Sequence, residues 1–164
     1  MAATIEVLKT YGDSGSPTEV VVTQPGLLST DDNASPISSP IIVPTGVDNY
    51  SYECWLRFKV GAVAPANQCT NFKIWSSGVA VGTGLTITIN TSAVTTYVTP
   101  VVTESVVGTR VDFVTKNSVS KVSVAGTLVN IGDKTDFSVF QLAVANTAGP
   151  GNVSYTVNYS YDES

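Results

Sequence analysis

Histidine is absent from this chain of 164 residues. Histidine is the commonest general base and metal ligand near neutral pH, so its absence excludes Ser-His-Asp and Cys-His catalysis and leaves a zinc site without its usual ligands. Paired carboxylates can hydrolyse glycosides, but the carboxylates of this chain fall mostly in expected loops and near its ends. The sequence therefore predicts a protein without enzymatic activity, catalytic residues or cofactor.

Charge is scarce, and positive charge is the scarcer kind. Only 13% of the residues are charged, with 8 Lys and Arg against 13 Asp and Glu, which gives a formal net charge of −5. Nucleic-acid binding requires clustered cations, and the chain has no basic run, so no direct nucleic-acid contact is expected. No apolar run approaches the roughly 20 residues of a membrane span, so no membrane contact is expected.

Cysteine is nearly absent, and a secretory signal is not recognisable. Cys54 and Cys69 are too few for a disulfide framework. A hairpin between their strands would bring them within range, but a pair of buried thiols is favoured over a disulfide because no signal directs the chain to an oxidising compartment. The start of the chain lacks a basic segment followed by an apolar block, so synthesis in the cytoplasm is expected unless a signal has been removed.

β-Branched residues and alternating patterns are what the sequence contains instead. Alternation of large apolar and small polar residues predicts strands at 4–9 (an edge strand), 18–23, 52–60, 69–75, 85–90, 137–145 (a central strand) and 153–163. Turn residues separate them and no helical pattern is convincing. The expected fold is an all-β antiparallel β-sandwich, Ig-like or jelly-roll-like, with long irregular loops and one domain over residues 1–164. The last two strands are expected to form a terminal hairpin.

The alternation also assigns the faces of the strands. It predicts these core residues: Leu56, Phe58, Phe72, Ile74, Tyr155, Val157 and Tyr159. Trp55 and Arg57 fall on the opposite, charged face of their strand, where Trp55 can be covered by the stem of Arg57 or by a partner. Both are therefore candidate interface residues.

Residues 24–49 form a proline-rich stretch that suits neither a strand nor a helix. Proline cannot donate to a sheet ladder, so we expect an extended arm or an ordered surface loop. Within it, Pro36, Pro40 and Pro44 are candidate interface residues, because such an arm can lie across a neighbouring subunit. Asp162 and Glu163, at the end of the last strand, are two further candidates. The acidic clusters at 31–33 and 133–136 are interpreted as turns, since neither has the spacing of a calcium loop.

Three stretches resemble small β-sandwich virion proteins of tailed bacteriophages. They are Tyr52-Glu53-Cys54-Trp55-Leu56-Arg57-Phe58-Lys59, Asn71-Phe72-Lys73-Ile74-Trp75, and the ending from Gly149-Pro150-Gly151 to Tyr161-Asp162-Glu163. Residues 91–136 and the proline-rich stretch lie outside the resemblance. It implies a non-enzymatic virion component, assembled in the host cytoplasm, and brings no catalytic residues with it.

Among virion roles, a capsid decoration (cement) protein is favoured. Such a protein would bind the major capsid protein or other virion proteins and form a homo-oligomer, with a trimer favoured. The low charge, the hydroxyl-rich composition and the proline-rich stretch agree with this hypothesis. A tail or neck component is the near alternative. A carbohydrate-binding adhesion module that stacks sugars on Trp55, Trp75 and tyrosines is the alternative from another class.

Overall fold

The computed structural model of the protein describes residues 2–34, 38–78, 80–151 and 153–164. Within them, every pairing between strands is antiparallel. The elements are β1 (Ile5–Tyr11), β2 (Thr18–Val21), β3 (Asn49–Tyr50), β4 (Cys54–Val60), β5 (Cys69–Ser76), β6 (Leu85–Asn90), β7 (Arg110–Asp112), the 3-10 helix η1 (Phe113–Thr115), β8 (Val122–Val124), β9 (Ser138–Val144) and β10 (Val157–Glu163).

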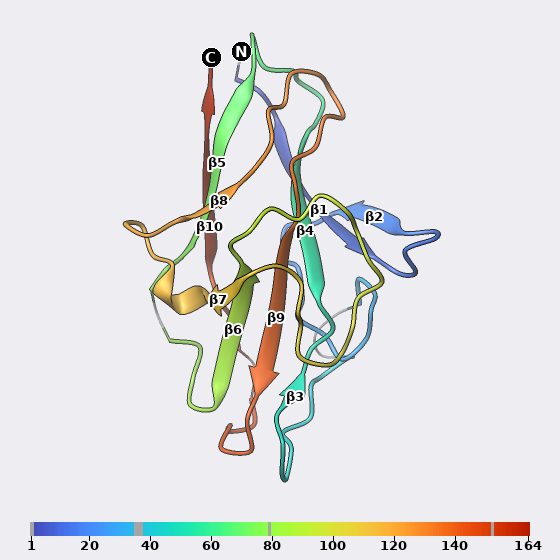
Figure 1. Ribbon diagram of the computed structural model, residues 1–164, viewed down its shortest axis with the longest axis vertical. Helices are drawn as coiled ribbons and strands as arrows, with labels where there is room; N and C mark the ends of the chain where they lie inside the picture. Colours follow the sequence, from blue (N-terminus) through green and yellow to red (C-terminus); the bar gives the residue numbers. More distant parts are fainter. Residues whose placement is uncertain (1, 35–37, 79, 152) are drawn as a thin grey trace.

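The strands form two sheets. The large sheet has the order β2-β1-β4-β9-β6-β7, with β3 also paired to β9, and the small sheet has the order β10-β5-β8. Figure 1 shows β5, β8 and β10 grouped together, with both ends of the chain at the same end of the molecule. The predicted all-β antiparallel sandwich is confirmed.

The core lies between the inner faces of the two sheets. The ring of Phe58 from β4 stacks on that of Phe72 from β5, with 5.3 Å between their centroids. The predicted core residues Leu56, Phe58, Phe72 and Ile74 are all buried in this cluster. Alternation therefore assigned the inner faces of β4 and β5 correctly.

The predicted pairings between consecutive strands are wrong in two places. β4 pairs with β1 and β9, whereas β5 pairs with β8 and β10 in the other sheet. Likewise, β9 lies in the large sheet and β10 in the small one, so the terminal hairpin does not form. In both cases the connecting loop crosses the sandwich instead of turning back within a sheet. β1 lies between β2 and β4, so it is not the edge strand that was expected.

Two predicted core residues on β10 are exposed. Val157 is 41% exposed and Tyr159 is 45% exposed, while Tyr155 is half-buried. The side of the strand was predicted correctly, because the ring of Tyr159 faces that of Phe58 at 5.2 Å. The burial was wrong because β10 is the edge of the small sheet, where its inner face is only partly covered.

Both cysteines are buried free thiols, the state favoured from the sequence. Burial raises the pKa of Cys54 to about 11, so its thiol stays protonated and unreactive near neutral pH. Nothing in the described part of the chain is a helix of the length and apolarity needed to cross a membrane.

Candidate interaction surface

The connection between β6 and β7, residues 91–109, crosses the outer face of the large sheet (Figure 1). At one end, Phe137 N donates to Val94 O at 2.9 Å. At the other, the Tyr97 hydroxyl donates to Gly12 O at 2.7 Å, in the turn between β1 and β2. This covering loop, as we call residues 91–109, thus spans the sheet from β9 to β1.

Trp55 lies beneath the covering loop with none of its surface exposed. Its ring packs edge-on against Tyr97 at 5.1 Å and against Phe137 at 5.3 Å. Together with Val139, these rings form a second apolar cluster, on the opposite side of the large sheet from the main core. The prediction that Trp55 is an interface residue is therefore wrong in this structure. The cover, expected from the stem of Arg57 or from a partner, is supplied by the covering loop of the chain itself.

A buried carboxylate holds the covering loop in place. Glu53 is 3% exposed, and its two carboxylate oxygens accept hydrogen bonds from Trp55 Nε1, at 3.1 Å, and from the Ser105 hydroxyl. The backbone N–H of Glu53 donates to Val101 O at 3.1 Å. These bonds satisfy a carboxylate that would otherwise be costly to bury.

Gln141 of β9 holds the same loop from a second position. Its side-chain oxygen accepts from Ser105 N at 2.7 Å, and its nitrogen donates to Thr103 O at 2.7 Å and to Ser51 O at 3.0 Å. Gln141 is 2% exposed, so the side chain is committed to this structural role.

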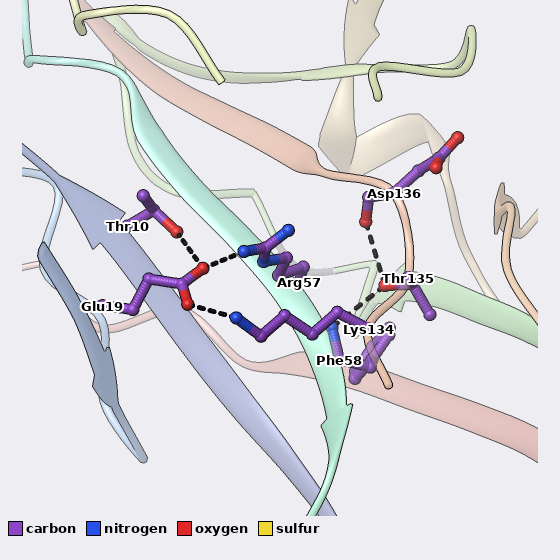
Figure 2. Close-up of polar contacts among 7 residues, drawn as sticks. All are labelled: Thr10, Glu19, Arg57, Phe58, Lys134, Thr135 and Asp136. Carbon is purple, nitrogen blue, oxygen red and sulfur yellow. Dashed lines mark hydrogen bonds and ion pairs between the residues drawn. The ribbon is translucent and has the colours of Figure 1, made fainter. Parts of the chain in front are cut away.

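Arg57, the second interface candidate on this face, is engaged within the chain (Figure 2). Its guanidinium pairs with Glu19 of β2, which also binds Lys134 at 2.5 Å. The guanidinium carbon lies 4.5 Å from the centre of the Phe137 ring. Burial acts to raise the pKa of Glu19, but the hydrogen bonds from Lys134 and Arg57 outweigh it and hold that pKa below its ordinary value. Arg57 thus stabilises the packing of its own sheet.

In the described parts of the proline-rich stretch, residues 24–34 and 38–49, hydrogen bonds join the chain to neighbouring segments. Tyr52 N donates to Leu28 O at 2.8 Å, and Gly12 N donates to the Asp31 carboxylate at 2.8 Å. Burial raises the pKa of Asp31. Pro40 is exposed and Pro44 is half-buried, whereas Pro36 lies outside the described residues.

Asp162 and Glu163 are exposed, and both hold neighbouring segments. Asp162 accepts from Asn71 Nδ2 of β5 at 2.8 Å. Glu163 accepts from the backbone N–H of Ala3 at 3.0 Å, which ties the start of the described chain to its last strand. No hydrogen bond, ion pair or ring contact among the described residues joins either of them to Trp55 or Arg57.

Two further loop segments carry exposed apolar side chains. They are residues 40–50 and 98–106, which we call the loop face, and they approach each other at Tyr50, where Asp48 and Glu104 both act on its hydroxyl. Burial raises the pKa of Tyr50, and the nearby carboxylates of Glu104 and Asp48 add to the effect. Large apolar residues exposed on the loop face are Ile42, Val47, Val98, Val101, Val102 and Val106. Sequence reasoning missed this surface because these valines follow no strand or helix period.

The two acidic clusters behave as turns. The Asp32 carboxylate accepts from Ala34 N, and the Asp133 carboxylate accepts from Val129 N and Asn130 N, each at 2.8 Å. No set of three or more Cys, Asp and Glu side chains is placed to hold a metal ion within the described ranges.

No family model, no curated protein and no solved structure matches the chain. The class established by the structure is an all-β antiparallel sandwich. Its function has to be argued from the geometry of its own surfaces.

Proposed function

We propose that the chain is a non-enzymatic structural protein of a phage virion, with capsid decoration as its role. The observation that carries the proposal is the loop face, where Ile42 is 75% exposed, Val47 is 87% exposed and Val106 is 89% exposed. Large apolar side chains exposed on these two loop segments are candidate contacts for another protein. The low charge of the chain reduces the desolvation cost of covering this surface.

The mechanism is contact with the major capsid protein, or with other virion proteins, at many symmetry-related positions of the head. Each contact is individually modest, and a homo-oligomer, with a trimer favoured, gains avidity by engaging several subunits at once. Binding across subunit joints would oppose the pressure of packaged DNA. Assembly of the virion would take place in the host cytoplasm.

The test is co-sedimentation with empty heads assembled from the major capsid protein of the proposed phage. We expect saturable binding to expanded heads and none to unexpanded heads. Val106→Asp should weaken binding at least tenfold, because it places a charge on the loop face. Val119→Asp is the matched control, since Val119 is 93% exposed but lies in the turn between η1 and β8. Absence of binding to heads would overturn the proposal, and co-sedimentation with tails would support the tail or neck alternative.

The adhesion alternative rests on fewer aromatic side chains than expected. Trp55 is inaccessible beneath the covering loop, which leaves Trp75 of β5 and accessible tyrosines such as Tyr159. Trp75 is half-buried, and Lys121 Nζ lies 4.1 Å from the centre of its ring. A glycan array with the wild type and Trp75→Ala tests this alternative, which fails if no glycan binds.

A further inference from the structure

The two long sides of the sandwich differ in how they are closed. On the β8 side, residues 125–137 cross from the small sheet to the large one. Asp136 N donates to Ala125 O at 2.8 Å, and Thr135 N donates to Phe58 O at 3.0 Å. The crossing is tight, because a Cβ added to Gly126 (φ +146°) would lie 2.9 Å from Thr135 Cα. On the other side, the small sheet ends at β10, whose one paired neighbour among the described strands is β5.

Apolar side chains are left uncovered on this open side. Val153, Val157 and Tyr159 are between 41% and 46% exposed. The neighbouring Tyr161 faces the core, with its ring 5.6 Å from that of Phe72. Since side chains alternate along a strand, the exposed odd-numbered residues continue the inner, apolar face of the small sheet. They extend the core to a margin that the described chain covers only in part.

Part of the pairing capacity of this segment is also unused. The alternating pattern begins at Val153, but in the structure the strand begins at Val157, where pairing with Ser76 at the end of β5 starts. Residues 153–156 therefore have a strand sequence without a strand partner. The buried hydroxyl of Tyr155 has no hydrogen-bond partner in the described structure.

The edge lacks the features that normally protect an edge strand. Such strands usually carry lysine, proline or an inward-facing charge that prevents pairing with another chain. Residues 153–161 read Val-Ser-Tyr-Thr-Val-Asn-Tyr-Ser-Tyr and contain none of these. The nearest charges, Asp162 and Glu163, follow the segment at one end.

We propose that this edge pairs with the same edge of a second copy of the chain, antiparallel and centred on Val157. In that register Val157 faces its counterpart and Tyr155 faces Tyr159, so both inner faces join into one apolar surface. The carboxylates of Asp162 and Glu163 then lie beyond the paired stretch, near residues 149–151 of the other copy. Parallel pairing in register would place them beside each other, where like charges repel. The register about Val157 is self-complementary, which favours a second copy, and the charge placement selects its antiparallel orientation.

The product is a two-fold dimer, in place of the trimer favoured above, with a continuous small sheet in the order β8-β5-β10-β10-β5-β8. A two-fold contact uses the same patch on both copies. The irregularity in the β5–β10 register between Ser160 and Asp162 limits the paired stretch at its end. This inference does not depend on a virion role, because the loop face and β10 are separate surfaces and capsid binding can fail while dimerisation persists.

Cross-linking through Val157→Cys tests the register. Facing residues of antiparallel strands have Cα atoms about 4.5–5.5 Å apart, within the roughly 4.4–6.8 Å range of disulfides. With oxidised glutathione as the electron acceptor, the two introduced thiols, one from each copy, form one disulfide and two molecules of reduced glutathione. We expect a covalent dimer within minutes at about 50 μM protein, a workable concentration for micromolar association. Val119→Cys is the exposed control and should form at least tenfold less dimer, while the buried Cys54 and Cys69 contribute none.

Light scattering after size exclusion tests the contact without cysteine chemistry. The wild type should have a mass that approaches twice 17.1 kDa as concentration rises, and Val157→Lys should lower that mass while Val119→Lys should not. Near-ultraviolet circular dichroism checks that both variants are folded. The inference is overturned if the wild type is a monomer at all concentrations, if the two lysine variants have equal masses, or if Val157→Cys and Val119→Cys cross-link equally.

Discussion

The outer face of the large sheet and the inner face of β10 carry similar side chains but have opposite surroundings. On the large sheet, Trp55 and Val139 are fully buried, because the covering loop lies across them. On β10, Tyr159 and Val157 remain more than 40% exposed, because no segment of the described chain crosses that margin. The side chains of an apolar sheet face become buried only when another segment packs over them, and that segment can belong to the same chain or to a partner.

The largest expected effect is the loss of the side chain beneath the covering loop. Trp55→Ala should lower the free energy of unfolding by about 3–5 kcal/mol, since it opens a large cavity. It should also expose residues 91–109 to limited proteolysis. Chemical denaturation measures the first effect and mass spectrometry of the fragments measures the second. Trp75→Ala is the matched control, and an equal loss in both variants would contradict the comparison.

The next effect concerns the carboxylate that holds the loop. Glu53→Gln replaces one carboxylate oxygen, which accepts a hydrogen bond, with an NH2 group, which can only donate. This NH2 group would then face another donor, either Trp55 Nε1 or the Ser105 hydroxyl. A buried donor left without an acceptor costs about 1–3 kcal/mol. Glu104→Gln, an exposed change in the same loop, should leave stability within about 0.5 kcal/mol. Denaturant midpoints of the two variants decide this point, and equal midpoints would show that the Glu53 bonds do not hold the loop.

The same substitution, valine to threonine, can be made on both faces and its effect on the free energy of unfolding compared. Val139→Thr buries a hydroxyl and should cost about 1–3 kcal/mol, whereas Val157→Thr exposes one and should stay within about 0.5 kcal/mol. Thermal and chemical unfolding should be measured at low protein concentration, so that self-association at β10 does not contribute. Similar losses at the two positions would mean that β10 is covered in solution.

The smallest effect is a dependence on pH. The pKa of Glu19 is lowered in the folded state relative to its ordinary value of 4.5. Its contribution to stability is therefore present above about pH 4.5 and is lost as the pH falls through the lower folded pKa. Because the ion pairs are partly exposed, the loss should be under about 1 kcal/mol. Glu19→Gln should reduce the loss of unfolding free energy as the pH falls below about 4.5. An unchanged pH dependence in this variant would show that Glu19 does not cause it.

Sequence reasoning could predict the faces of strands but not their covers. In the stretch from Tyr52 to Val60 the alternation placed Leu56 and Phe58 in the core, as the structure confirms. The same alternation placed Trp55 on the outer face, which is also correct, yet its burial depends on residues 91–109. That segment has no periodicity, so nothing local showed that it would cross the sheet.

The pairing of strands across the sandwich was equally hidden. Consecutive strands were expected to form hairpins because short loops favour them. The loops after β4 and β9 instead cross between sheets, and β5 finds its partner at β10. Such long-range pairing is decided by the fit of whole faces, which a single alternating stretch does not reveal. The loop face was missed for the same reason, since it forms where two aperiodic segments meet.

The pairing of β5 with β10 also has a consequence for how the chain folds. During synthesis β5 leaves the ribosome long before β10, so the small sheet has an open edge until the last strand has been made. Pairing of strands so distant in sequence slows folding. Until its own β10 has paired, the free edge of β5 can pair with the β10 of another chain. Exchange of this strand between chains would produce a swapped dimer whose subunits are completed by each other. Expression at a high local concentration should therefore favour entangled chains over separate ones.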